Sequence, residues 1–170
     1  LAKKLNHEHQ AFETGNIDLN LGVQFKRDQD VITLAAQDGH FYVDDAHFRH
    51  SYGASAQWQR NIDARNQASI YGQYAKLNYL DNEIRNADRY VLGANYAHAF
   101  EWPTSPIVFV GAYLAQEDAT QKGTQFLDQD IYGLRAGGQL VVAPRWVAYA
   151  SAGYESRAHQ ADDVAFLKKR

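Results

Sequence analysis

The sequence predicts an all-β fold, specifically an antiparallel up-and-down transmembrane β-barrel, and three observations lead to this. Apolar and polar residues alternate in many segments, the alternating segments are long, and turn-like stretches separate them. The clearest segment runs from Ile17 to Phe25, where odd positions are apolar and even positions are polar or glycine. Successive side chains of a strand point to opposite faces, so such a segment has one apolar and one polar face.

The same alternation recurs along the chain and indicates about seven strands, each about 11–13 residues long by the period-two pattern. Strands of soluble proteins usually have about 5–6 residues, whereas a tilted strand that crosses a bilayer needs about 9–11. The excess length favours a membrane barrel. The predicted strands lie near residues 16–27, 48–60, 66–77, 87–99, 106–116, 130–142 and 146–157.

The links between the predicted strands alternate between long and short. Bacterial outer-membrane barrels have short turns on one side and long loops outside the cell. On this basis the first and the last predicted strands both run outward. The long links are 28–47, 78–86 and 117–129, and the short links are 61–65, 100–105 and 143–145.

An odd number of strands cannot close an antiparallel barrel, and bacterial single-chain barrels have even counts. We therefore expect residues 16–170 to be a segment of a larger barrel, with further strands from elsewhere, and residues 1–15 to be a linker or short helix. Residues 31–37 are the candidate for a missed strand, although counting them would break the alternation of long and short links.

Composition narrows the function classes. The net charge of −3 gives no basic field for nucleic acid, and the absence of cysteine excludes disulfides and Cys-based metal or redox sites. No segment approaches the ~20 consecutive apolar residues of a membrane-spanning helix. Tyrosine supplies 11 residues, which is typical of a barrel with a polar lumen and aromatic rims.

The alternation also assigns side chains to faces. We predict that one polar set faces the lumen and that one aromatic set faces the membrane near its two boundaries, together with Trp102. The lumen set, in which mixed charges either brace neighbouring strands or line an aqueous path, is Gln24, Lys26, Gln57, Gln73, Arg89, Arg135, Gln139 and Glu155. The aromatic set is Trp58, Tyr74, Tyr96, Trp146 and Tyr154.

Few residues suggest chemistry. His40, His47 and His50 lie near Asp44 and Asp45 and are weak candidates for a metal site, because His and carboxylate bind divalent metals. Their spacing matches no ligand pattern, so a polar loop is the preferred interpretation.

Catalytic residues are not expected either. His50 and Ser51 are adjacent on a strand and point to opposite faces, and the set Ser151, Glu155 and His159 is a weak coincidence. We expect no enzyme activity and no cofactor.

Four segments resemble a known family: the Tyr-x-Ala-x-Ala-x-Trp pattern at 52–58, the turn at 61–66, and the runs at 85–90 and 130–138. They resemble the C-terminal barrels of outer-membrane proteins with tetratricopeptide repeats, nearest to the surface lipoprotein assembly modifier family. The resemblance implies a Gram-negative outer-membrane barrel, in contact with outer-membrane lipid, that acts in transport or protein secretion by moving a lipoprotein or other protein cargo to the cell surface.

Two other functions remain open. A soluble lipocalin-like barrel would bind an apolar ligand with its apolar faces turned inward and filled by large residues. A lipid-modifying barrel enzyme would need a catalytic triad, and the sequence offers no convincing one.

Overall fold

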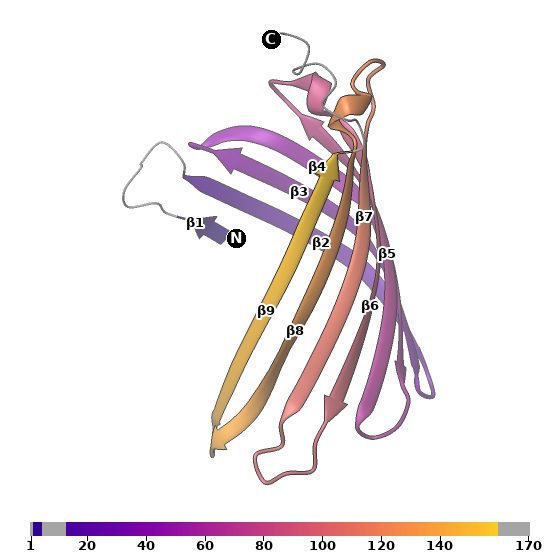
Figure 1. Ribbon diagram of the computed structural model, residues 1–170, viewed down its shortest axis with the longest axis vertical. Helices are drawn as coiled ribbons and strands as arrows, with labels where there is room; N and C mark the ends of the chain where they lie inside the picture. The colour runs from indigo at the N-terminus through magenta and orange to yellow at the C-terminus, as the bar shows by residue number, and fades with distance from the viewer. Residues whose placement is uncertain (1, 5–12, 160–170) are drawn as a thin grey trace, which may run out of the picture.

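A computed structural model describes residues 2–4 and 13–159 of the chain, which form one antiparallel sheet (Figure 1). The strands lie side by side in chain order from β1 to β9. β1 has three residues and the other eight strands have 13 to 16. The strands are β1 (Ala2–Lys4), β2 (Thr14–Arg27), β3 (Asp30–Val43), β4 (Ala46–Asn61), β5 (Asn66–Tyr79), β6 (Ala87–Ala99), β7 (Ile107–Ala119), β8 (Gln129–Ala143) and β9 (Trp146–His159).

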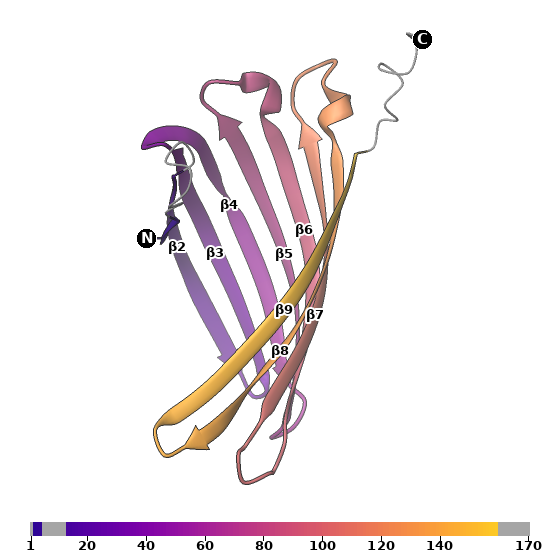
Figure 2. The ribbon, with the colours of Figure 1, turned by 60° about the vertical axis from the view of Figure 1, so that its left-hand side comes forward.

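The eight long strands curl into half of a barrel wall (Figures 1 and 2). At one end, here called the turn end, lie the connections 28–29, 62–65, 100–106 and 144–145; at the other, the loop end, lie 44–45, 80–86 and 120–128. The 3-10 helices η2 (Glu83–Arg85) and η3 (Gln125–Leu127) belong to two loop-end connections, at the top of Figure 1.

The prediction of seven strands is wrong, because the link predicted at 28–47 contains β3. Its 31–37 segment, the candidate for a missed strand, pairs with β2 and β4 along its full length. Asp44 and Asp45 make the turn between β3 and β4 with φ of 50° and 60°. Aspartate tolerates this left-handed conformation, which a two-residue hairpin requires at both positions. Long and short links therefore do not alternate at this hairpin.

The extra strand also reverses the predicted direction of β2. β2 runs toward the turn end and β9 runs away from it, so the two edge strands are antiparallel. With eight long strands, an even number, the strand count does not prevent closure of the barrel. The described sheet is nevertheless open, since β2 beyond Asn16 pairs only with β3, and β9 pairs only with β8. Ala2–Lys4, predicted to lie in a linker or short helix, pair instead with the first residues of β2.

The two faces of the sheet differ, as the period-two pattern predicts. Directly opposed residues share a face, and the row Gln24, Thr33, Gln57, Tyr71 and Gly93 runs across five strands on the polar face. This face is the concave one, where curvature crowds side chains from alternate strands together. The buried apolar residues lie on it: Val31, Ala75, Leu77, Ala115 and Ile131.

Glycine makes room for aromatic rings on the concave face. The Tyr113 ring lies over Gly133 of the next strand, where a Cβ would come within 1.9 Å of it. The Tyr71 ring covers Gly93 in the same way, with an approach of 2.4 Å. A ring over a cross-strand glycine fills the space that the missing side chain leaves and fixes register.

We predict that Gly133→Ala lowers the free energy of unfolding by about 1–3 kcal/mol, because the added methyl displaces the Tyr113 ring. The matched control is Gly153→Ala on β9, where the nearest atom to a new Cβ is 3.4 Å away. Denaturant titration of the folded protein measures both variants. Equal stability of the two variants would contradict the packing described here.

Candidate functional site

The concave face holds every residue of the predicted lumen-facing set. By strand register, all eight side chains project from this face: Gln24, Lys26, Gln57, Gln73, Arg89, Arg135, Gln139 and Glu155. Whether this face lines a lumen depends on what closes the barrel, and lumen facing remains a prediction.

Hydrogen bonds between alternate strands brace the concave face. The Gln73 amide on β5 donates to Gln37 Oε1 on β3 at 2.5 Å, bridging over β4. Arg135 Nη2 on β8 donates to Asn95 Oδ1 on β6 at 2.7 Å, past Gly111 of β7. The Tyr113 hydroxyl on β7 donates to the Glu155 carboxylate on β9, past Gly133.

Opposite charges also pair on this face. Arg89 Nη1 and Glu117 Oε1 lie 3.3 Å apart on neighbouring strands, and Arg157 Nε lies 2.8 Å from Glu155 Oε1. These ion pairs agree with the interpretation that the mixed charges brace the wall. Sequence reasoning missed Glu117, which lies just beyond the strand predicted at 106–116, and gave no role to Asn95.

The convex face is apolar and exposed. Leu21 is 77 % exposed, Leu92 63 % and Trp146 71 %, although these side chains are large and apolar. Monomeric soluble proteins rarely expose a contiguous apolar patch of more than a few hundred Å². A face of this kind is usually a contact surface for a membrane or another protein. Among the described residues, no helix has the length and apolarity to span a bilayer.

Aromatic side chains border the apolar face in two belts. The belt nearer the loop end consists of Tyr52, Tyr74, Tyr90, Tyr132 and Tyr154, and the belt nearer the turn end of Trp58, Tyr96 and Trp146. Within a strand the belts are well separated: Tyr90 and Tyr96 are six residues apart on β6, or about 20 Å at ~3.3 Å per residue. All five predicted membrane-facing aromatic residues belong to these belts.

Polar atoms of both belts point away from the apolar centre. The Tyr74 hydroxyl donates to Asp88 Oδ1 at 2.9 Å on the loop-end side, and Lys76 Nζ lies 4.0 Å from the same oxygen. On the turn-end side, Trp58 Nε1 donates to Asp30 Oδ1 at 2.9 Å. Tyr and Trp adopt this arrangement where an apolar medium meets water.

The three candidate histidines meet at the loop end of β3 and β4, on the convex face outside the tyrosine belt. His40 and His50 are directly opposed, and Asp38 lies two residues before His40. The two carboxylates named from the sequence, Asp44 and Asp45, are in the turn; Asp38, which sequence reasoning missed, is the acid that contacts the histidines. The Asp38–His40 spacing on one strand face was its only sequence signal.

Of the weak catalytic candidates, His50 and Ser51 project from opposite faces of β4. Ser51 lies on the concave face and its hydroxyl donates to the Gly39 carbonyl oxygen, whereas His50 projects from the convex face. Ser151 and Glu155 share the concave face of β9. The side chain of His159 lies outside the part that the structure describes.

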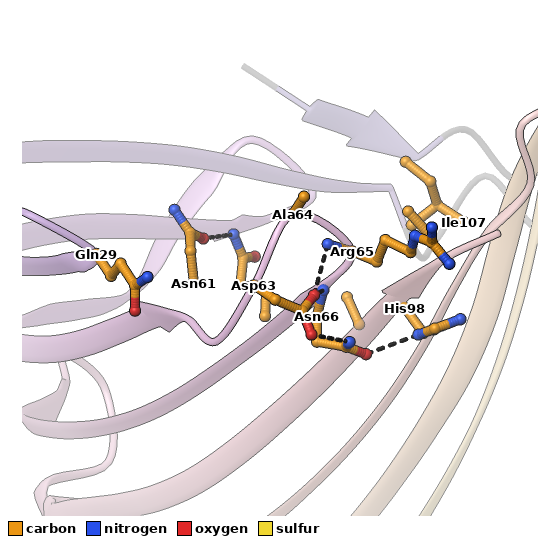
Figure 3. Close-up of a pocket in the computed structure, with 11 residues that line it drawn as sticks. Gln29, Asn61, Asp63, Ala64, Arg65, Asn66, His98 and Ile107 are labelled. Atoms are coloured by element: carbon orange, nitrogen blue, oxygen red, sulfur yellow. Dashed lines mark hydrogen bonds between the residues drawn. The ribbon is translucent and has the colours of Figure 1, made fainter. Parts of the chain in front are cut away.

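A polar hollow of about 550 Å³ lies at the turn end beside the β4–β5 turn (Figure 3). Asp63 organises it: its carboxylate accepts from the backbone N–H groups of Arg65 and Asn66 at 2.7 and 2.8 Å, and from the Asn66 amide at 2.6 Å. The Asn66 oxygen is in turn 2.7 Å from His98 Nδ1. These hydrogen bonds, the Arg65 N–H first, hold the pKa of Asp63 below its usual value.

The Arg65 side chain pairs with Glu101 of the next turn-end connection. The hollow thus lies between two turns, and the polar groups around it already bond one another. These bonds hold the two turns together.

No protein-family model, curated protein or solved structure matches this chain.

We predict that Asp63→Asn lowers stability at neutral pH and that the difference from wild type narrows in acid. The folded-state pKa of Asp63 is depressed, so its contribution is complete above the usual pKa of 3.8 and is lost as pH falls through the lower folded-state value. Unfolding titrations of both proteins between neutral pH and strong acid measure the difference. A difference that stays constant over this range would contradict the assignment.

Proposed function

We propose that this sheet is part of the wall of an outer-membrane β-barrel, with the convex face in lipid and the concave face on a polar lumen, and that the protein acts in transport or surface export. The observation that supports this best is the path of the two aromatic belts across the strands.

Both belts slip along the strands in the same direction. From Tyr52 on β4 to Tyr154 on β9 the tyrosine belt crosses five strand spacings and shifts six residues toward the turn end. At ~4.8 Å per strand and ~3.3 Å per residue, this corresponds to strands inclined at about 40° to the normal of the belt. Strands of outer-membrane barrels are tilted by about 35–45°. A flat interface drawn across tilted strands produces this slip.

The curvature suggests a wide barrel. Eight long strands make only half of a wall, so closure at the same curvature needs on the order of 16 strands, the size at which barrels leave an aqueous channel. Unpaired backbone groups at the edges of β2 and β9 would each cost several kcal/mol in hydrocarbon. Further strands, from more of the same protein or another chain, are therefore part of the proposal.

The cargo class rests on the resemblance to surface lipoprotein assembly modifiers. A lipoprotein or secreted protein needs a wide polar passage. The concave face is polar enough to be hydrated, and because its acidic and basic side chains are paired it creates little net electrostatic field. The partners in this proposal are outer-membrane lipid and such a cargo.

The lipocalin-like alternative requires large apolar residues on the concave side, filling a closed interior. Here the concave face is rich in glutamine, glycine and charge, and most of the exposed large apolar side chains project from the convex side. This arrangement favours the membrane barrel over the soluble carrier.

A charge placed on the convex face tests the membrane assignment. We predict that Leu92→Arg costs about 2–4 kcal/mol of folding free energy in lipid vesicles, because Leu92 lies between the belts, where arginine would face hydrocarbon. Gln57→Arg on the concave face is the matched control and has a small effect. Equal losses for both variants, or a wild-type protein that remains monomeric in water without detergent, would sink the membrane assignment.

An export assay tests the transport assignment separately. We expect cells that lack the protein to keep normal lipoprotein levels but to expose less of at least one lipoprotein at the surface, measured by protease treatment of intact cells. Restoring the gene restores exposure. Unchanged surface exposure of all lipoproteins and secreted proteins would contradict the export role while leaving the membrane barrel intact.

A further inference from the structure

The loop end of β3 and β4 brings one carboxylate and three imidazoles into contact. His40 Nε2 lies 3.0 Å from Asp38 Oδ2, and His50 Nε2 lies 2.7 Å from Asp38 Oδ1. The His40 and His50 rings stack at 4.6 Å between centroids with 13° between their planes. One ligand atom from each of the three residues lies within 4.8 Å of the others.

The geometry points to a binding site for a divalent first-row transition ion such as Zn²⁺. The ion would be held by His40 Nε2, His50 Nε2 and the Asp38 carboxylate. Bonds of about 2.0–2.2 Å in tetrahedral geometry separate ligand atoms by about 3.3 Å. The oxygen–nitrogen distances of 2.7 and 3.0 Å therefore need to open by a few tenths of an ångström, and the two stacked rings need to tilt so that both Nε2 lone pairs point at the ion. This inference does not depend on the proposed function.

His47 contacts His40 and does not itself bind the ion in this site. His47 Nε2 lies 3.0 Å from His40 Nδ1, so with the ion on Nε2 the Nδ1–H of His40 donates to His47. Metal-ligating histidines almost always have such a partner, which fixes the tautomer and ring orientation.

A β-bulge opposite Phe41 and Tyr42 places His47 next to His40. The bulge leaves Phe48 as the extra residue and pairs Tyr42 with His47. In unbroken register Tyr42 would oppose Phe48, and His47 would project from the concave face. Bulges often re-aim a side chain in this way next to functional sites.

The ligand set also sets selectivity. Two imidazoles and one carboxylate suit zinc, copper and nickel, whereas magnesium and calcium require oxygen ligands. Asp38, His40 and His50 are partly exposed, with side-chain exposures of 42 %, 35 % and 31 %, so an ion has direct access and water can fill the remaining coordination positions.

Titration of the untagged full chain with ZnCl₂, in whichever buffer or detergent keeps it folded, tests the site by calorimetry. We expect one ion per chain at this site. Asp38→Asn and His50→Ala should each weaken binding at least tenfold. His47→Ala should weaken it by about tenfold, the usual effect of losing the hydrogen-bond partner of a ligating histidine. The matched control is His98→Ala, a histidine at the turn end, which should leave the affinity unchanged.

Cu²⁺ bound to the wild-type chain gives a readout that needs no variant, because electron paramagnetic resonance detects coupling to the two imidazole nitrogens. Wild-type Zn²⁺ affinity in the double variant His40→Ala/His50→Ala would overturn the proposal, as would MgCl₂ binding of equal strength. The absence of nitrogen coupling in the Cu²⁺ spectrum would do the same.

Discussion

Pairing of backbone N–H and C=O groups between neighbouring strands is the constraint on which the rest of this structure depends. The ladders fix which residues stand opposite one another, and opposed residues share a face. A one-residue slip would turn every side chain of a strand to the other face. Leu92 then would join Arg89 and Glu117 on the polar side. The alternation in sequence and the register of the ladders therefore have to agree, and they place most of the exposed large apolar side chains of the wall on one side.

Curvature then makes the two faces unequal. On the concave face, side chains of alternate strands converge, and at some positions a large ring fits only because its cross-strand neighbour is glycine. Tyr113 over Gly133 is the clearest case, and the ring lies where its hydroxyl reaches Glu155 one strand further on. On the convex face, side chains spread apart and gain little from one another. The polar face thus supplies the internal cohesion of the sheet, while the apolar face leaves its large side chains exposed and depends on its surroundings.

The sequence predicted most strands to within a few residues, because seven of them combine clear alternation or apolarity with recognisable turns. β3 was missed for physical reasons. Val31 and Ile32, and then Ala35 and Ala36, put apolar residues on both faces, which erases the period of two. Its loop-end half contains aspartate and histidine, which read as a loop, and its hairpin turn is Asp44-Asp45 rather than a glycine-containing pair. Missing one strand then reversed the inferred direction of β2 and led to the prediction that an odd strand count prevents closure. The openness of the sheet has a different origin: its curvature is too gentle for eight strands to close.

Side-chain contacts between strands were the least predictable feature, and the histidine group shows why. The sequence drew attention to His40, His47 and His50 but associated them with the nearest carboxylates along the chain. Asp38 became their partner only through the register that sets it two residues from His40 on the face that His50 also occupies. His47 depends on one further detail, the bulge that turns it to that face. Both contacts depend on how the strands pair, and neither can be inferred from the spacing of the residues along the sequence. This polar group lies at the loop-end border of the apolar face: Asp38 stands opposite Tyr52 of the tyrosine belt, and the histidines lie beyond it toward the loop end. Asp38, His40 and His50 are partly exposed, so their desolvation costs little.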